Sequence, residues 1–78
     1  MQTTHERHRF LTVVSIIDQA DFGKLLEETA FHSSQAAEDY GVSQRNAIRL
    51  KRREEGETDE VFLEAIIYQT RQLELFDY

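Results

Sequence analysis

Five basic side chains lie close together near the middle of this sequence. Arg45, Arg49 and Arg52 recur at positions that share one face of an α-helix. Lys51 and Arg53 flank them, so this window holds five of the nine Lys and Arg residues and no acidic residue. Because basic groups attract phosphates, a stripe of this kind on a stable helix favours nucleic-acid binding.

The chain as a whole is acidic, which conflicts with that interpretation. Its 78 residues include 15 acidic and 9 basic side chains, giving a formal net charge of -6. Five acidic residues follow the basic window directly, namely Glu54, Glu55, Glu57, Asp59 and Glu60. Distant acids are screened over about 8 Å at physiological salt, but acids beside the arginines would repel DNA. The sequence leaves open whether this run lies beside the arginines or turns away at Gly56.

The stretch SSQAAEDYGVSQRNAIRLKRR, residues 33–53, resembles the helix-turn-helix of phage and bacterial DNA-binding regulators. The residues that carry the resemblance are Ala37, Gly41, Val42, Ala47 and Leu50. A small residue at Ala37 lets two helices approach closely, and Gly41 would form the turn between them. Ala47 and Leu50 would pack the second helix onto the first.

In that family the second helix enters the major groove of DNA. The resemblance therefore implies a small DNA-binding protein, a transcriptional or replication regulator of phage or plasmid type, with helix 44–55 as the reading helix. The residues expected to contact DNA are Ser43, Gln44, Arg45, Asn46, Arg49, Arg52 and Arg53. Arginine pairs with guanine and Gln or Asn with adenine, whereas Arg52 and Arg53 are expected at phosphates. The implied partners are double-stranded DNA and a second copy, in a homodimer.

The sequence predicts an all-α fold, a single domain over residues 1–78 with about five helices and a helix-turn-helix at about 34–55. The absence of proline and the presence of only three glycines favour helices with few breaks. The expected helices cover about 4–20, a segment capped by Asp21, Ser33 or Ser34 to Tyr40, 44–55, and a last helix after Thr58. Gly56 is expected to stop the fourth helix.

The first of these helices has an alternative. Thr3 and Glu6 resemble a capping box, and Phe10, Val13, Val14 and Ile17 recur at helical spacing. The stretch FLTVVSII is also rich in β-branched residues, which are typical of strands.

The C-terminal stretch QLELF resembles the short peptide with which bacterial replication and repair proteins bind the sliding clamp. This resemblance implies a ligand tail over 72–78, with Gln72, Leu73, Leu75 and Phe76 as protein-binding residues. The alternative function is thus a protein-binding adaptor or inhibitor that does not bind DNA directly. In a further alternative, Leu73 and Phe76 continue a helical stripe with Ile66 and Gln69 and form core or dimer contacts.

Other chemistry finds little support in the sequence. There is no cysteine and no glycine-rich phosphate loop, so we expect neither an enzyme nor a bound cofactor. His5 and His8 lie one helical turn apart but lack a strong third ligand, so no metal site is expected. The apolar runs are too short to span a membrane, and the first residues, MQTTHERHR, lack an apolar signal core. We therefore expect a cytoplasmic protein with no membrane partner.

Overall fold

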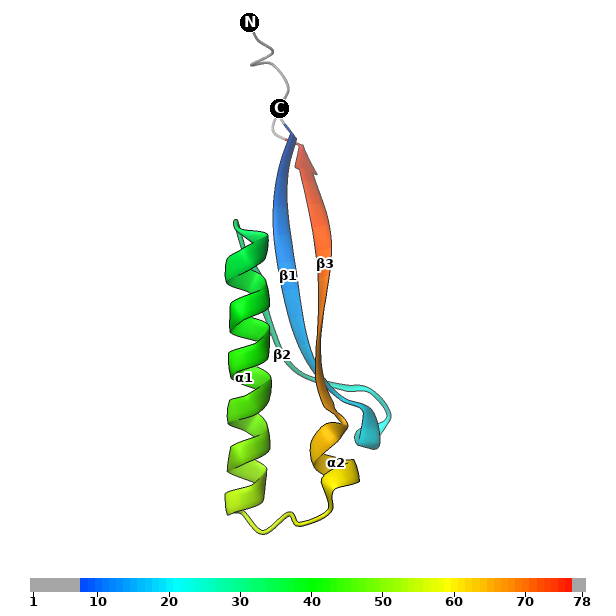
Figure 1. Ribbon diagram of the computed structural model, residues 1–78. Coiled ribbons are helices and arrows are strands. Elements are labelled where there is room, and N and C mark those ends of the chain that lie inside the picture. The colour runs from blue at the N-terminus through cyan, green and yellow to red at the C-terminus, as the bar shows by residue number, and fades with distance from the viewer. Residues whose placement is uncertain (1–7, 77–78) are drawn as a thin grey trace, which may run out of the picture.

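The computed structural model describes residues 8–76 and has a mixed α/β fold (Figure 1). Its elements are β1 (His8–Asp18), the 3-10 helix η1 (Gln19–Asp21), β2 (Lys24–Phe31), α1 (Ser34–Glu54), α2 (Glu60–Glu64) and β3 (Ile66–Phe76). The strands form one sheet in the order β2-β1-β3, with both neighbours antiparallel to β1. The predicted all-α bundle of five helices is therefore wrong.

The central strand β1 occupies most of the first predicted helix. Thr12, Val14, Ile16 and Asp18 alternate along it and are all buried. The apolar residues of this segment fit both helical and strand spacing, so spacing alone did not distinguish a helix from a strand. β-Branched side chains pack well on a pleated surface, and pairing on both edges of β1 fixes the strand. The strand alternative for FLTVVSII is thus confirmed.

A tight connection joins β1 to β2 where a helix capped by Asp21 was predicted. The Asp18 carboxylate accepts the backbone N–H of Ala20 at 3.0 Å and so caps η1. Phe22 and Gly23 then turn the chain with φ angles of 55° and 74°. An irregularity between Ile16 and Ile17 shifts the register with β2, so the prediction of a second helix is wrong as well.

Helix α1 is continuous, whereas the sequence predicted two helices and a turn. Ser33 caps it as expected, because its Oγ accepts the Ala36 N–H at 3.2 Å. Gly41 lies in the helix interior, and a Cβ there would approach Cδ2 of Tyr68 to 2.5 Å. This glycine therefore permits close packing of α1 on β3 and forms no turn, so the predicted helix-turn-helix is wrong. The helix ends at Glu54, before Gly56 with a φ of 112°, which confirms the predicted stop.

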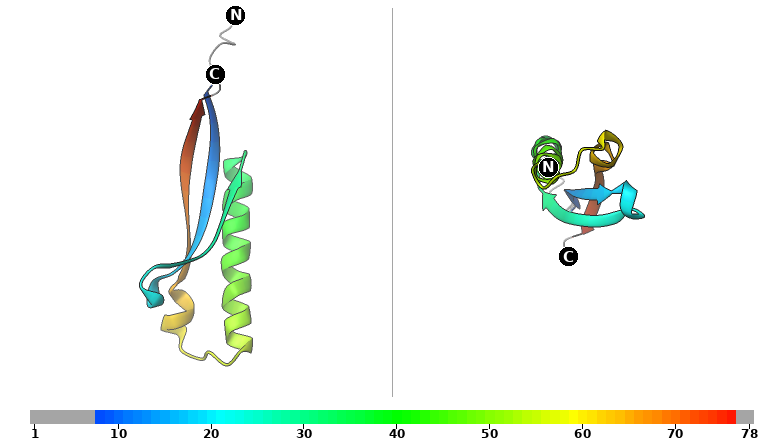
Figure 2. Two further views of the ribbon diagram at one scale, coloured as in Figure 1. Left: turned by 180° about the vertical axis from the view of Figure 1, so that it is seen from behind. Right: turned by 90° about the horizontal axis from the view of Figure 1, so that it is seen from below.

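Helix α1 covers one face of the sheet, which we call the inner face. The core there contains Val14, Ile16, Ala37 and Ile66, with Leu26, Phe31, Tyr40, Ile48 and Tyr68 packed around it. Helix α1 connects β2 to β3, which run parallel on either side of β1, and parallel strands need such a long crossover. Seen along the long axis, both helices lie on the same side of the strands (Figure 2, right panel).

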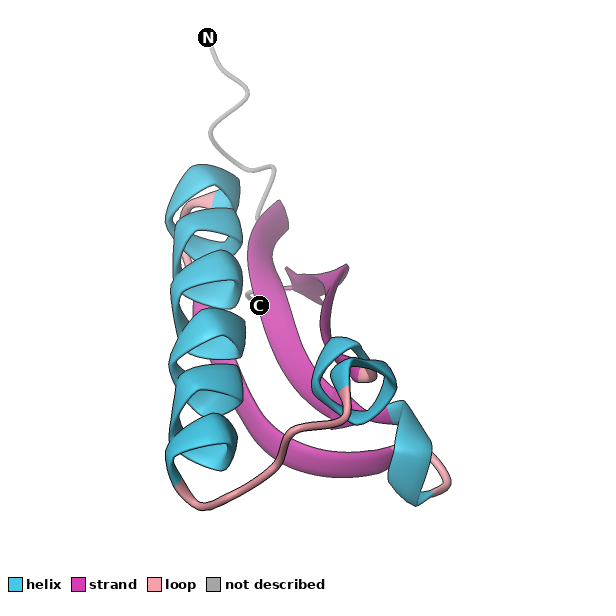
Figure 3. Ribbon diagram, turned by 60° about the horizontal axis from the view of Figure 1, so that its bottom comes forward, coloured by secondary structure: helices cyan, strands magenta, loops and turns pink. Residues whose placement is uncertain are grey.

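The last predicted helix is reduced to one short turn. Asp59, rather than Thr58, caps α2 by accepting the N–H of Val61 at 3.0 Å. The N–H of Gln19 donates to the carbonyl of Ala65 at 2.9 Å, so α2 lies at the same end of the molecule as η1 (Figure 3). The chain then continues as β3 because its β-branched and aromatic residues pair along β1.

Strands β1 and β3 extend beyond the rest of the sheet. Pairs from His8–Phe76 to Leu11–Leu73 join these two strands, whereas the pairing of β1 with β2 begins only at Thr12. The result is a two-stranded ribbon that projects past α1 (Figure 1). The predicted capping box at Thr3 and Glu6, the His5 position and the last two residues of the predicted tail lie outside the described residues. Within 8–76 no helix combines the length and apolar character needed to cross a membrane.

Candidate protein-interaction surface

The arginines expected to contact DNA make contacts within the protein. Arg52 extends from α1 and forms an ion pair of 2.9 Å with the buried Asp18 of β1. Arg49 donates to the Ile66 carbonyl at 2.7 and 3.2 Å and to the Glu64 carbonyl at 3.2 Å. These side chains hold α1 against β1 and against the junction of α2 with β3.

The remaining members of the predicted set also lie on α1. The guanidinium carbon of Arg45 lies over the Tyr68 ring, 5.4 Å from the ring centre. The Nε and Nη2 groups of Arg45 donate to Asn46 Oδ1 at 3.2 and 3.1 Å. Gln44 donates to Glu27 Oε1 at 2.7 Å, and Ser43 is exposed. The structure therefore brings the predicted residues onto one helix, but it directs several of them toward the sheet.

The acidic run folds back beside the basic window. Arg53 forms an ion pair of 2.9 Å with Glu60 at the start of α2. Its hydrogen bond and positive charge hold the pKa of the Glu60 carboxyl below its ordinary value. The sequence left open whether the acidic run turns away from the arginines at Gly56. The chain turns there, but it brings Glu60 back beside Arg53.

The predicted ligand tail is part of the sheet. Gln72 donates to Thr12 Oγ1 and to Ser34 Oγ, both at 3.3 Å, on the inner face. Leu73 and Leu75 pair with Leu11 and Arg9 of β1. The backbone of Phe76 pairs with His8 at the end of the ribbon. A clamp-binding peptide would have to leave β1 before it could dock.

The face of the sheet opposite α1 is uncovered within residues 8–76, and we call it the outer face. The strand registers and the alternation of side chains assign its members. They are Arg9, Leu11, Val13, Ser15 and Ile17 of β1, Leu25, Glu28 and Ala30 of β2, and Ile67, Gln69, Arg71, Leu73 and Leu75 of β3. Val13, on the central strand, is nevertheless buried. Leu25, Leu73 and Leu75 are 52%, 39% and 38% exposed.

One ion pair crosses the middle of the outer face. Arg71 of β3 reaches over β1 to Glu28 of β2, with 3.5 Å between nitrogen and oxygen. Ser15 of β1 donates to the same carboxylate at 3.1 Å. The two charged side chains are 57% and 42% exposed, so they present a positive and a negative group side by side.

Apolar residues lie on both sides of this ion pair. Toward the ribbon, Leu11, Leu73 and Leu75 form what we call the ribbon cluster. Toward the β1–β2 turn, Ile17 pairs with Ile67 on one side and Leu25 on the other, and we call these three residues the turn cluster. Exposed apolar residues of this kind fit a protein partner, whereas a phosphate-binding surface is mainly basic.

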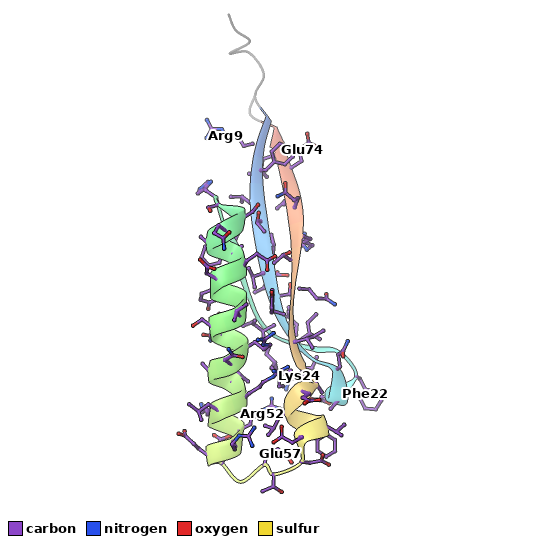
Figure 4. All side chains as sticks on the ribbon, in the orientation of Figure 1. Arg9, Phe22, Lys24, Arg52, Glu57 and Glu74 are labelled. Atoms are coloured by element: carbon purple, nitrogen blue, oxygen red, sulfur yellow. The ribbon has the colours of Figure 1, made fainter. Side chains whose placement is uncertain are left out.

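A second feature is a shallow hollow between η1, α1 and α2. It is lined by Asp18, Ala20, Asp21, Arg52, Glu57 and Phe62. Figure 4 shows Arg52 and Glu57 at this end of the molecule. Asp18 and Arg52, two of the charged groups that line the hollow, already form an ion pair with each other, so they are not available to bind a small molecule.

The comparisons with known proteins identify no relative. The chain matches no known family model, and no curated protein or solved structure is significantly similar to it. The candidate surface therefore rests on the geometry alone. The sequence named Leu73 and Leu75 as residues of a clamp-binding tail, and it did not place Leu11, Ile17, Leu25 or Ile67 on an exposed face of a sheet. The strand alternative for FLTVVSII was the signal that would have placed Leu11 and Ile17 on one face.

Proposed function

We propose that this chain is a protein-interaction module that binds its partner through the outer face of the sheet. The observation that carries the proposal is the uncovered apolar surface on either side of the Arg71–Glu28 ion pair. Burying exposed apolar area of this kind against a partner removes it from water, which stabilises the complex. The function is thus that of an adaptor or inhibitor, without direct DNA binding.

The electrostatics of the basic window support this choice over DNA binding. Arg49, Arg52 and Arg53 have partners within the fold, and Glu60 lies beside the last of them. Phosphate binding would have to compete with these contacts in a molecule of net charge -6. DNA binding, which the sequence predicted, is tested by titration with mixed-sequence duplex DNA at low salt. On the present proposal we expect no binding.

A site-specific photocrosslinking experiment tests the proposed function. A photoreactive residue in place of Leu25 or Leu73 is expected to capture protein partners in cells. The same residue in place of Leu50, which is 55% exposed on α1, serves as the matched control and is expected to capture little. DNA binding at low salt together with equal capture from both surfaces contradicts the proposal.

A further inference from the structure

We infer that the partner of the outer face is a second copy of this chain, an inference that rests on the proposed function. The copies would stack their sheets face to face, with a two-fold axis running along β1. Aligned sheets pack about 10 Å apart and interdigitate their side chains. In such a dimer the two outer faces meet at the centre, and the α1 helices that cover the inner faces lie on the outside.

Charge complementarity selects this orientation. A two-fold axis along β1 places β3 of each copy over β2 of the other, because the two strands flank β1 on opposite sides. Arg71 then faces Glu28 of the second copy, and the symmetry repeats the contact. The two ion pairs become a ring of alternating charges, whereas an axis across the strands would set Arg71 over Arg71 and Glu28 over Glu28.

The turn cluster fits the same axis. Ile67 of β3 meets Leu25 of the second copy's β2, and Ile17 meets its own counterpart on the axis. Leu11 also lies on the axis, whereas Leu73 and Leu75 extend beyond the Thr12–Phe31 pair at which β2 begins to pair with β1, so they meet no strand of the second copy. One operation therefore satisfies the charged pair and the turn cluster, as an isologous interface requires.

The overlapping area is that of a small, weakly held dimer. At about 3.3 Å per residue, the three-stranded part of the face spans about 23 Å by about 14 Å, and along the ribbon only β1 overlaps its counterpart. Two such faces cover about 800 Å² before side-chain relief is counted, which lies in the range of weak interfaces below about 1,200 Å². A chain of 78 residues buries only about 60% of its surface by folding, so it gains from a second layer.

Charge-reversal variants test the inference by sedimentation equilibrium, with circular dichroism as the check on folding. Wild type is expected to dimerise, and Arg71→Glu and Glu28→Arg are each expected to weaken the dimer about tenfold or more, because four like charges meet. An equimolar mixture of the two variants is expected to restore dimers, since opposite charges then meet across the interface. The pair within each single-variant chain stays repulsive, so restoration has to come from contacts between copies.

Two controls complete the design. The double variant Arg71→Glu/Glu28→Arg restores both kinds of pair and is expected to dimerise, whereas Arg53→Glu, on α1, is expected to leave the wild-type dimer unchanged. Monomeric wild type, or a mixture that stays monomeric, overturns the inference. Dimers that persist in Glu28→Arg also overturn it, because the copies then associate through another surface such as the outer edge of β3. If wild type is monomeric while Leu25 and Leu73 still capture other proteins, only self-association is wrong and the proposed function stands.

Discussion

At the scale of single residues, Gly41 shows how a local pattern misleads. The sequence around it predicts a turn between two helices, yet the glycine lies inside α1 against Tyr68. Ser33 and Gly56 were predicted correctly because a cap and a helix stop depend on neighbouring residues. The role of Gly41 depends on a side chain of β3, which no local pattern contains.

Gly41→Ala is expected to lower the free energy of unfolding. The added methyl would overlap the Tyr68 ring, and overpacking costs about 1–3 kcal/mol, which outweighs the gain of about 1 kcal/mol from helix propensity. Urea denaturation measures the change. Ser43→Ala, on the exposed surface of the same helix, is the control and is expected to stay within about 0.5 kcal/mol of wild type. A stabilised Gly41→Ala protein would contradict the packing described here.

Tyr68 is expected to give the protein an alkaline pH dependence. Its hydroxyl donates to Glu38 Oε1 at 2.9 Å, and this hydrogen bond, followed by burial, raises the pKa of the tyrosine. The stabilisation is present below the ordinary tyrosine pKa and is lost as the pH rises through the raised pKa, because the unfolded chain ionises first. Ultraviolet titration of tyrosinate is expected to show a lower pKa for Tyr68 in Glu38→Gln. An unchanged titration curve would show that Glu38 does not raise this pKa.

At the scale of elements, tertiary pairing overrides local preference. The segment now in β1 fits both periods, and only its pairing with β2 and β3 decides between them. Helix α1 was predictable over 34–55 because its caps and composition are local, although its two predicted halves are one helix. Strand β3 was predicted as a helix because Ile66, Gln69 and Leu73 recur at helical spacing, while its alternation becomes clear only beside β1.

Two neighbouring arginines of α1 are expected to contribute unequally to stability. Arg52→Ala leaves Asp18, whose side chain is 7% exposed, without its ion-pair partner. Since Arg52 itself is 37% exposed, we expect a loss of about 1–2 kcal/mol. Arg53→Ala removes a contact between exposed groups and is expected to change stability very little. Thermal unfolding of both variants measures the difference, and equal stabilities would mean that the Asp18–Arg52 pair does not hold α1 to β1.

At the scale of the whole molecule, the outer face depends on information that the sequence does not display. Leu11, Leu25 and Ile67 are far apart along the chain, and only the strand registers bring them to one surface. The net charge of -6 also conceals the arrangement, because the Arg71–Glu28 pair is locally neutral. Composition predicted a small domain, but it did not indicate which face of the sheet residues 8–76 leave uncovered.

A dimer held by this face is expected to make thermal stability depend on protein concentration. Association stabilises the folded state by mass action, so the Tm rises as the concentration increases. Scanning calorimetry over a wide concentration range measures the rise. Arg71→Glu is expected to remove the dependence, whereas Arg53→Glu is expected to retain it. A Tm that is constant for wild type would contradict self-association.

The most direct test is an isotope-filtered NOE measurement on an equimolar mixture of labelled and unlabelled protein. Only contacts between copies give signals in this experiment. Intermolecular NOEs are expected between the methyl groups of Ile67 and Leu25, which lie on separate strands within one copy with Ile17 between them. Intermolecular NOEs confined to α1, or none at a concentration where dimers are present, would show that the copies do not associate through the outer face.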